Sequence, residues 1–474
     1  MIQRERSANE QPRMNRRDFL KNTALGGVGL LVLGHSRSAW SYAASERLRI
    51  ALIGVGGRGS WFVRTIPNLG EEVVAMCDVN ERRAAGSFKR LPDVKTYHDF
   101  RKMLEEMDKQ IDAVIVATPD HIHAVASARS MKMGKHVYCE KPLTHNVAEA
   151  RALREMASKR KVATQMGNQG TASEAFRRCV ELVQAGVLGD VREVHAWNTG
   201  GGPGHRKRPA GTHPVPDYLQ WDLWLGPAPY RPFHPQWLNW HGWREFGTGV
   251  LGNWACHTMN LAFKALKMDS LWYGEPSGGS KPVIRLRADV SEIDRDSFPR
   301  METVRYEIPP RGELPPVKLN WYNGGGNQLE KNGIRRQIEE LMGRRLDWSS
   351  EDDPIWKDWA GILLVGRNGM LYSNAHNTEF TLLPEDKFKD FEGPPRSLPR
   401  SRGHEREWLD ACRGGPAAMS NFDYAGPLAE LVLLANVATQ FEQKIEYDPR
   451  AMKIVNSREA DQALRREYRK GWSL

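Results

Sequence analysis

Short apolar runs alternate with polar or amphipathic stretches through the first third of the chain. Residues 48–53 are aliphatic and β-branched, and the run is short enough for a buried parallel strand. Similar runs occur at 72–77, 113–117 and 136–139. Stretches of helical composition lie between them, at 99–109 and 121–133. This alternation predicts the α/β class, with a doubly wound parallel sheet.

After residue 280 the pattern changes to alternation of single apolar and polar residues. Such alternation is typical of strands with one buried face. It occurs in three segments, at 282–287, 303–308 and 317–322. Further on we expect a hairpin and two helices, at 362–366 with 369–372, 403–413 and 425–439. Since 474 residues are too many for one hydrophobic core, we predict two domains, over 47–168 and 169–474.

The first 44 residues have the three regions of an export signal. Arg16 and Arg17 are followed by Phe-Leu-Lys, a mildly apolar run extends from Thr23 to Gly34, and small residues follow. These regions in this order are typical of a signal segment, and the paired arginines resemble the bacterial twin-arginine signal. We therefore predict that residues 1–44 direct export to the periplasm. The alternative is a chance Arg-Arg pair ahead of an ordinary helix.

Composition argues against several classes of function. The formal net charge is +10, of which residues 1–43 contribute +4 (seven Lys and Arg minus three Asp and Glu). The rest is spread along the chain, so we expect no nucleic-acid partner. No apolar run after the leader reaches eighteen residues, so no membrane span is expected in the mature chain. The five cysteines are far apart without C-x-x-C spacing, which predicts neither a disulfide framework nor a metal site.

A glycine-rich turn follows the first expected strand directly. Residues 54–59 read Gly-Val-Gly-Gly-Arg-Gly, which is G-x-G-x-x-G, and a helical stretch begins at Ser60. In this fingerprint Gly54 permits the tight turn, Gly56 lets the backbone approach a pyrophosphate, and Gly59 lets helix and strand pack closely. The motif alone is weak evidence. With a strand before it and a helix after it, it predicts a dinucleotide site.

Asp78 ends the second strand, nineteen residues after Gly59. A carboxylate here accepts hydrogen bonds from the ribose diol and repels a 2′-phosphate, which favours NAD as the cofactor. NADP stays possible, because Arg82 and Arg83 follow closely and can serve a phosphate. Two further strand ends, at 118–120 and 140–142, are expected at the same crevice.

From residue 54 onward the sequence resembles the Gfo/Idh/MocA oxidoreductase family. The resemblance is carried by GVGGRG (54–59), ATPDHIHAVAS (117–127), GKHVYCEKPLTHNVAEAR (134–151), TQMGNQG (164–170), GTGVLGNWACHTMNLAFKAL (247–266), HEREWLDACRGG (404–415) and SNFDYAGPLAELVLLANVA (420–438). It covers nearly everything after the leader. The arrangement after residue 164 resembles a subgroup of exported members.

The resemblance implies an N-terminal Rossmann domain and a C-terminal α/β domain with an open, mainly antiparallel sheet. It also implies a sugar or polyol substrate and a homo-oligomer formed through the C-terminal sheet. By the family's pattern Lys141 is the catalytic lysine and His257 is an active-site histidine. The glycine fingerprint and the family pattern together give these candidate cofactor-binding residues: Gly54, Gly56, Gly57, Arg58, Gly59, Asp78, Thr118, Pro119, His123, Glu140 and Lys141.

The sequence departs from the family pattern just before His257. The family commonly has Gly-Asp three to five residues ahead of this histidine, whereas this chain has Gly252-Asn253. Asn260 also stands where Asp is frequent. Because an amide carries no charge, the resemblance does not extend to a proton relay through position 253.

Oxidation of an alcohol removes a hydroxyl proton while a hydride leaves the carbon. Burial and a cationic nicotinamide both disfavour an ammonium group, so Lys141 is expected to accept that proton as a neutral amine. His257 can orient the hydroxyl or share the proton. The alternatives are a surface lysine after a strand and a histidine satisfied within the apolar helix expected over 254–266.

Six tryptophans fall between residues 221 and 254. Their rings suit the C–H face of a sugar, but for most of them packing within the second domain is the favoured interpretation. The Gly- and Pro-rich segment 200–216 has no regular pattern and is a candidate lid or partner loop. Five residues are candidate substrate contacts: Asn168, His205, Arg206, Trp243 and Asn253.

Three functions stay open at this point. The leading prediction is an NAD(P)-dependent oxidoreductase that acts on a hydroxyl or ketone of a sugar or polyol. Because free NAD is scarce outside the cytoplasm, the second is a redox-neutral sugar hydrolase, lyase or epimerase with tightly bound, internally recycled NAD. The third is a non-catalytic sugar-binding or scaffold protein of the same fold.

Overall fold

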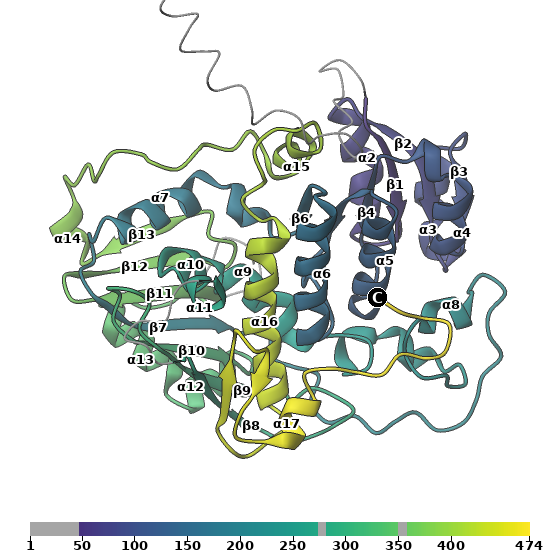
Figure 1. Ribbon diagram of the computed structural model, residues 1–474. Coiled ribbons are helices and arrows are strands. Elements are labelled where there is room, and N and C mark those ends of the chain that lie inside the picture. The colour runs from purple at the N-terminus through teal and green to yellow at the C-terminus, as the bar shows by residue number, and fades with distance from the viewer. Residues whose placement is uncertain (1–46, 274–280, 349–357) are drawn as a thin grey trace, which may run out of the picture. The chain divides into compact units, whose positions relative to one another are not determined.

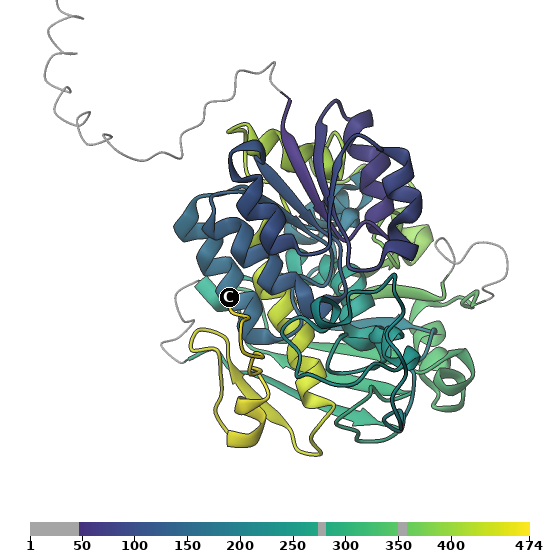
Figure 2. The ribbon, with the colours of Figure 1, turned by 90° about the vertical axis from the view of Figure 1, so that its right-hand side faces the viewer.

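The computed structural model describes residues 47–273, 281–348 and 358–474 (Figure 1). The leader predicted over 1–44 lies outside the described residues. Two sheets organise the described part, one formed early in the chain and one formed by later segments (Figures 1 and 2).

The first sheet has six parallel strands in the order β3-β2-β1-β4-β5-β6. Its strands are β1 (Arg49–Ile53), β2 (Glu72–Cys77), β3 (Lys95–Tyr97), β4 (Ala113–Val116), β5 (His136–Cys139) and β6 (Thr164–Met166). The helices between them are α2 (Gly59–Asn68), α3 (Glu81–Arg90), α4 (Phe100–Glu106), the 3₁₀ turn η1 (Asp108–Gln110), α5 (Asp120–Lys132) and α6 (Val147–Arg160). Every residue of β4 is buried, as expected for a strand covered on both faces. The predicted doubly wound parallel sheet is confirmed.

The second sheet has nine strands in the order β13-β12-β11-β7-β10-β9-β8-β14-β15. They are β7 (Val191–Asn198), β8 (Ile284–Val290), β9 (Glu302–Ile308), β10 (Val317–Asn323), β11 (Ala360–Gly366), β12 (Gly369–Asn374), β13 (Phe380–Leu383), β14 (Ile445–Asp448) and β15 (Lys453–Ile454). Only β7 and β10 pair in parallel, and the other neighbours are antiparallel. The predicted α/β domain with a mainly antiparallel sheet is confirmed, as is the β11–β12 hairpin.

Short helical segments connect the two sheets and flank the second one. The 3₁₀ turns are η2 (Gln169–Ala172), η3 (Pro235–Leu238) and η4 (Trp240–Gly242), and η5 (Leu251–Ala255) is a π-helical turn. The α-helices up to residue 342 are α7 (Glu174–Gln184), α8 (Trp221–Leu225), α9 (Cys256–Thr258), α10 (Asn260–Ala265), α11 (Ser270–Tyr273), α12 (Gly326–Lys331) and α13 (Ile334–Met342). The remaining α-helices are α14 (Glu385–Phe388), α15 (His404–Cys412), α16 (Phe422–Ala438) and α17 (Arg458–Gln462).

Alternate residues of the second sheet enter two different cores. On β10, Leu319 and Trp321 belong to the large core shared with the first domain, whereas Tyr322 packs with Leu329 of α12 and Ile338 of α13. This follows from the two-residue period of a strand. Helix α16 is buried along nearly its whole length and packs against both α6 and β8, so it joins the two domains (Figure 1).

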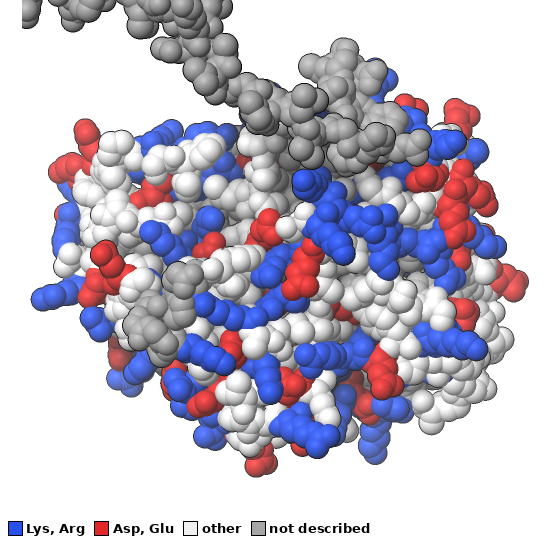
Figure 3. All heavy atoms as spheres, viewed as in Figure 1, with Lys and Arg blue, Asp and Glu red and all other residues white. Residues whose placement is uncertain are grey.

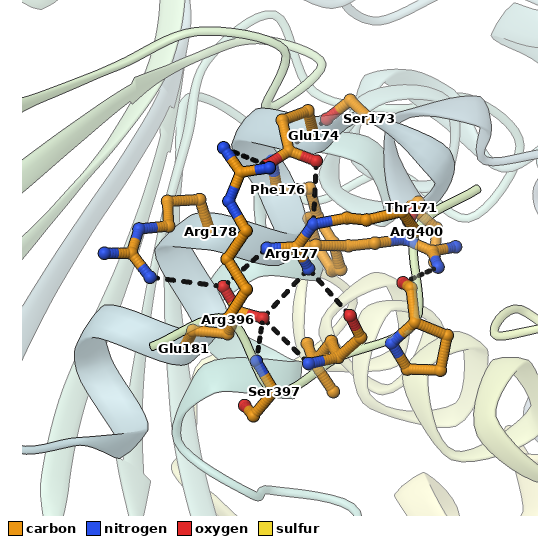
Figure 4. A network of polar contacts seen from close by, with 12 residues as sticks. Thr171, Ser173, Glu174, Phe176, Arg177, Arg178, Glu181, Arg396, Ser397 and Arg400 are labelled. Atoms are coloured by element: carbon orange, nitrogen blue, oxygen red, sulfur yellow. Dashed lines mark hydrogen bonds and ion pairs between the residues drawn. The ribbon is translucent and has the colours of Figure 1, made fainter. Parts of the chain in front are cut away.

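A polar network fixes a long connecting segment onto α7. Figure 4 shows Glu181 at its centre, where its carboxylate accepts hydrogen bonds from the Ser397 and Leu398 amides at 2.7 and 2.8 Å. The guanidinium of Arg400 donates to both carboxylate oxygens, at 2.9 and 2.8 Å. The Glu181 side chain is only 1% exposed. Burial of this carboxylate is therefore offset by four hydrogen bonds to one short segment.

On the face in Figure 3, Lys and Arg are interspersed with Asp and Glu over most of the surface, and several Lys and Arg lie side by side in its upper part. Within 47–273, 281–348 and 358–474, no helix has both the length and the apolar character needed to cross a membrane.

Candidate cofactor and active site

A cavity of about 1140 Å³ lies beyond the carboxyl ends of β1, β2, β4 and β5. Its other walls come from the segments 201–206, 238–242 and 249–257 of the second domain. The carboxyl ends of parallel strands are where ligands bind in open α/β sheets. The volume exceeds the range of about 300–1,000 Å³ typical of pockets for drug-sized ligands, so it accommodates a larger molecule.

The glycine loop after β1 can be formed only without side chains at two of its positions. Gly54 has φ of +82°, and a Cβ there would lie 2.7 Å from the Ala117 carbonyl oxygen. A Cβ on Gly59, the first residue of α2, would lie 1.7 Å from the Gly54 oxygen. Gly54 thus makes the tight turn, and Gly59 allows α2 to pack close to β1.

Asp78 lies at the rim of this loop. One carboxylate oxygen accepts hydrogen bonds from the Val55 and Gly56 amides at 2.9 and 3.0 Å, and the other accepts from the Asn80 amide at 2.9 Å. The carboxylate is therefore held in one orientation at the cavity that Asp78 lines, and it keeps further lone pairs for another donor. Arg83 lies beside the loop, with its Nη2 3.2 Å from where a Cβ of Gly57 would be.

These residues fit a dinucleotide. The crowded glycine turn leads into the N-terminus of a helix, which favours phosphate, and Asp78 presents a fixed carboxylate for a ribose diol. Gly54, Gly56, Gly57, Arg58 and Asp78 all line the cavity and would hold the cofactor. Gly59 is buried beneath the loop and does not line it.

Arg58 and Glu140 close one side of the cavity. Arg58 Nε donates to Glu140 Oε1 at 2.9 Å, and the guanidinium carbon lies 4.5 Å from the Trp61 ring centroid. Burial alone would lower the pKa of Arg58, but the adjacent Glu140 raises it above its usual value. Gln169 also donates to Glu140 Oε1, at 3.4 Å. The carboxylate of Glu140 therefore links the phosphate loop to the turn after β6.

Thr118 and Pro119 line the cavity, whereas His123 supports them from behind. The His123 ring nitrogens lie 2.8 Å from the Pro142 oxygen and 2.9 Å from the Thr118 oxygen. His123 is 1% exposed and does not line the cavity. It connects the loop after β4 to the loop after β5, which carries Lys141, so its place in the structure is that of a positioning residue.

Lys141 Nζ lies against Asn253. It donates a hydrogen bond to Asn253 Oδ1 and contacts the Asn253 backbone oxygen at 3.3 Å. Asn253 lies in the π-helical turn η5, a form often found at functional sites. A Cβ on the neighbouring Gly252 would lie 2.1 Å from Thr248 Oγ1, so glycine at 252 allows this turn to pack closely. Lys141 and Asn253 both line the cavity.

Two histidines stand beside Lys141. The ring centroids of His257 and His376 are 4.8 Å apart, and both residues line the cavity together with Trp254. Burial, and secondly the nearby Lys141, lower the pKa of His376 and bring that of His257 well below its usual range. Nδ1 of each ring is buried without a hydrogen-bond partner among the described residues. The lowered pKa values favour the neutral imidazoles, and both rings can bind a polar group in the cavity.

His376 was not predicted from the sequence. It lies in the turn between β12 and β13, more than a hundred residues after His257. The residue that accommodates the His376 turn is Gly170, where a Cβ would lie 1.9 Å from the His376 carbonyl oxygen. Glycine at 170 therefore lets the His376 turn approach the 168–171 segment.

The segment 217–242 and the C-terminal end form a wall on the adenosine side of the cavity. Backbone hydrogen bonds attach this segment to the chain just after Asp78, from Glu81 N to Tyr218 O at 2.9 Å and from Gln220 N to Val79 O at 2.8 Å. Trp472 lines the cavity, 6.0 Å from the Phe100 ring centroid and 4.4 Å from the Arg101 guanidinium carbon. This wall lies across the side where Asp78 would meet the ribose.

The candidate substrate contacts lie in different places. Asn253 and Arg206 line the cavity. Asn168 is fully buried, with Oδ1 accepting from Ser420, and it does not line the cavity. His205 is exposed and paired with Asp294. Trp243 is buried in an aromatic cluster and donates to the Gln236 oxygen at 3.0 Å.

Of the six tryptophans between residues 221 and 254, most pack within the second domain and some line the cavity. Four of the six pack in the aromatic cluster of the second domain: Trp221, Trp224, Trp237 and Trp243. Trp240 and Trp254 line the cavity, and Trp224 reaches it as well. In the described residues, no group of three or more His, Cys, Asp or Glu side chains is placed to hold a metal ion.

Two family models match the chain in sequence order. Residues 48–168 match the model described as "Oxidoreductase family, NAD-binding Rossmann fold", and residues 181–270 match "Oxidoreductase family, C-terminal alpha/beta domain". The first match agrees with the glycine loop and Asp78, so the N-terminal domain is an NAD-binding Rossmann domain. Both models describe parts of the Gfo/Idh/MocA oxidoreductases.

Curated relatives match over limited stretches. The chain is 28% identical over 152 residues to inositol 2-dehydrogenase of Salmonella typhimurium, which is 31% of this chain and 45% of that protein. It is 26% identical over 205 residues to a glycosyl hydrolase family 109 protein of Shewanella pealeana, covering 38% of this chain and 44% of the relative. The alignments thus span somewhat less than half the length of these relatives.

Solved structures share the fold over most of the chain. The WlbA dehydrogenase from Bordetella pertussis, in complex with NADH and UDP-GlcNAcA, has a TM-score of 0.54 and 14% identity and covers 84% of this chain and 98% of its own. At this identity the likeness concerns the fold. The family resemblance rests on the two consecutive matches, in which residues 48–168 and 181–270 fit models of the Gfo/Idh/MocA oxidoreductases.

Proposed function

We propose that this protein is an NAD-dependent oxidoreductase that acts on a hydroxyl or ketone group of a sugar or polyol. One observation carries the proposal: Lys141, Asn253, His257 and His376 converge on the same cavity that the glycine loop and Asp78 line. The similarity to inositol 2-dehydrogenase supports a polyol substrate.

The proposed role of Lys141 is to take the hydroxyl proton. NAD, when bound, accepts the hydride from the carbon or returns it. A neutral amine has two hydrogens and one lone pair, and Asn253 offers two acceptors, its Oδ1 and its backbone oxygen. With both hydrogens directed to Asn253, the lone pair is left for the substrate hydroxyl. Proton transfer by a positioned group contributes about 10²–10⁴-fold to the rate.

The two histidines are proposed to hold neighbouring hydroxyls. Their unpartnered Nδ1 atoms would each be satisfied by a hydroxyl group, which can donate as well as accept. Trp254 lies at 6.0 Å from the His257 ring centroid and offers a flat apolar face. A sugar or inositol supplies both features, with hydroxyls at its edge and C–H groups on its face.

The first test is direct. The purified protein is denatured, and the released small molecules are assayed for NAD(H) and NADP(H). Added NAD is then titrated into the wild type and an Asp78→Asn variant. NAD recovered or bound by the wild type, and bound more weakly by the variant, would support the proposal. If no nicotinamide nucleotide is recovered and none binds, a non-catalytic sugar-binding role replaces it.

A second candidate function is a redox-neutral reaction in which the hydride returns to the substrate in each cycle. Two observations favour it: the wall of 217–242 and Trp472 across the adenosine side, which would hinder release of a cofactor, and the similarity to a glycosyl hydrolase family 109 protein. The discriminating measurement is turnover of aryl glycosides without an added electron acceptor. Cleavage without acceptor favours this candidate, whereas a strict need for one favours net oxidation.

Two further proposals concern the location of the protein and its oligomeric state. We propose that residues 1–44, with Arg16 and Arg17, direct the folded protein through the twin-arginine route to the periplasm. We also propose a homo-oligomer formed through the nine-stranded sheet. Fractionation of cells that carry the wild type or an Arg16→Lys, Arg17→Lys variant tests the first point, and light scattering of the purified protein tests the second.

A further inference from the structure

A second cavity, separate from the cofactor site, has an unusual number of arginines. Its volume is about 430 Å³. Its walls are the start of α6, the segment 229–247, the loop 295–298, the end of α16 and residues 463–467. We call it the arginine pocket, after the six that line it: Arg208, Arg231, Arg244, Arg295, Arg465 and Arg466.

Acidic residues pair with four of these arginines and leave two, Arg244 and Arg466, without a carboxylate within hydrogen-bond distance. Three line the pocket, Glu245, Asp296 and Glu467, so the lining residues carry six positive and three negative charges, a net of +3. Arg231 pairs with Glu245, and Arg208 pairs with Asp296. Arg295 and Arg465 pair with Glu459 and Asp461, which do not line the pocket. A partly enclosed space with a net positive lining attracts anions.

Arg244 lies at the base of the pocket without a carboxylate in direct contact. Its Nε donates to the Asp294 and Ser297 carbonyl oxygens at 2.8 and 2.9 Å, and Nη2 donates to Thr439 Oγ1 at 3.0 Å. Its guanidinium carbon lies 4.5 Å from the Phe298 ring centroid. These contacts satisfy hydrogens without a direct ion pair, while Glu302 and Asp294 act on the guanidinium from a greater distance. Burial, the main cause, lowers the pKa of Arg244 to about 10.

Arg466 is held only by long polar contacts. Nη1 lies 3.3 Å from His145 Nδ1 and 3.2 Å from the Glu245 carbonyl oxygen, and Nη2 lies 3.4 Å from the His121 oxygen. Ordinary N–H···O bonds are near 2.9–3.0 Å. Its nearest carboxylate, Glu149, is 3.7 Å from Nε. The guanidinium therefore keeps much of its capacity to bind another acceptor.

Four buried polar atoms of the pocket have no hydrogen-bond partner among the described residues. Three are donors, Arg231 Nε, Arg466 Nε and Asn146 Nδ2, and one is an acceptor, Asn436 Oδ1. Buried polar atoms are rarely left unsatisfied, so such a group calls for a partner that is absent from the protein itself. The three unpaired donors are suited to the oxygens of an oxyanion, and the one unpaired acceptor is suited to a hydroxyl on the same ligand.

We propose that the arginine pocket binds a small oxyanion, a phosphate or carboxylate group that carries a hydroxyl, at a site distinct from the cofactor cavity. The two cavities share no lining residue. The segment 243–247, which lines the arginine pocket, falls in the sequence between two segments that line the cofactor cavity, 238–242 and 249–257. Exposed side chains at the rim, Arg208, Arg295 and Arg465, leave the pocket open to solvent. Binding here needs neither NAD nor Lys141, so it stands apart from the proposed reaction.

The test is calorimetric titration of inorganic phosphate, and separately of D-gluconate, into the purified protein at constant ionic strength. One site with a dissociation constant in the millimolar range or tighter is expected for at least one anion. The preferred anion identifies the oxyanion. Arg466→Gln and Arg231→Gln are each expected to weaken binding at least tenfold. Heat from neither anion would overturn the proposal.

The matched control is Arg83→Gln, which removes a guanidinium beside the glycine loop of the other cavity. It should leave binding unchanged. If Arg83→Gln abolishes binding and Arg466→Gln does not, the anion occupies the cofactor loop and the proposal fails. Should the buried variants not fold, Arg465→Glu reverses an exposed rim charge and must still weaken binding several-fold.

Discussion

Lys141 Nζ makes both of its polar contacts with one residue, Asn253, through the side-chain Oδ1 and the backbone oxygen. A neutral amide therefore occupies the place beside the amine where the family commonly has a carboxylate. The lysine is oriented by hydrogen bonds without an adjacent negative charge from this residue. This arrangement leads to the first prediction.

Asn253→Asp is expected to move the pH–rate profile to higher pH by about one unit, because an opposite charge favours the ammonium form of the neighbouring amine. Initial rates from pH 5 to 10 measure it. Asn253→Ala keeps the backbone acceptor and adds no charge, so it should lower the rate without moving the profile. Identical profiles for wild type and Asn253→Asp would refute the assigned contact.

Lys141→Met removes the amine and keeps much of the side-chain volume. We expect kcat to fall about 10²–10⁴-fold, with NAD binding nearly unchanged, because the glycine loop and Asp78 are untouched. Steady-state kinetics and NAD titration measure the two quantities. Lys89→Met, at an exposed position of α3, is the control and should leave both unchanged. A loss below tenfold would remove Lys141 from the proton-transfer step.

Glu181→Gln is expected to lower the free energy of unfolding by about 2–4 kcal/mol, because the Arg400 guanidinium and two backbone amides lose a buried carboxylate partner. Arg400, first, and the Leu398 and Ser397 amides lower the pKa of Glu181 to about 2. This stabilisation is present above pH 4.5 and is lost as the pH falls towards 2. Urea titrations should show the full difference between variant and wild type at pH 7 and a clearly smaller one at pH 3.

Glu174→Gln is the control for that variant. Its side chain is 51% exposed and shares the same arginine, Arg400. An exposed ion pair contributes little, so a change within about 1 kcal/mol is expected. Equal losses from both variants would contradict the importance given to burial at Glu181.

Glu302→Gln is expected to stabilise the protein above pH 7. Glu302 is buried on β9, and its Oε1 accepts from Trp321 Nε1 at 3.2 Å and from Asn323 Nδ2 at 3.4 Å. Burial raises the pKa of Glu302 to about 7. The folded state therefore holds this proton more tightly than the unfolded state, and stability falls as the pH rises from 4.5 to 7.

The neutral amide of Glu302→Gln avoids that loss. We expect a gain of about 1–3 kcal/mol at pH 8 and almost none at pH 4, because a pKa that differs by one between the folded and unfolded states corresponds to at most about 1.4 kcal/mol. Thermal unfolding at the two pH values measures it. Glu307→Gln, on the exposed side of the same strand, should change little. A destabilised Glu302→Gln at pH 8 would show that the carboxylate is ionised and paired.

Local patterns were sufficient to predict the first domain and much of the second. The strand before Gly54, the crowded turn and Asp78 follow one another within thirty-one residues, so their meeting needs no knowledge of distant contacts. The strands over 303–308 and 317–322 were equally visible, because apolar residues that enter one core alternate along them with mainly polar residues. The order of the strands in the sheet, β11-β7-β10-β9-β8, could not be predicted, because strand neighbours depend on pairing between remote segments.

The active-site end was predicted less completely. His257 and Asn253 were named because they lie in one recognisable motif, whereas His376 lies in a β-turn with no pattern of its own. Asn168 and Trp243 have the right chemistry for a sugar but are used in packing. The arginine pocket draws its residues from six separate parts of the chain, and no linear sequence pattern predicts such a site.

Trp472 has a practical consequence for every experiment described above. Its ring forms part of the cofactor cavity, so an affinity tag inserted close to residue 472 would lie near the lining of that cavity. Proteolytic trimming of a few terminal residues during purification would likewise remove part of its lining. A preparation with a shortened or tagged end would then differ in nucleotide content from the intact protein, and intact mass should be checked before any measurement of NAD.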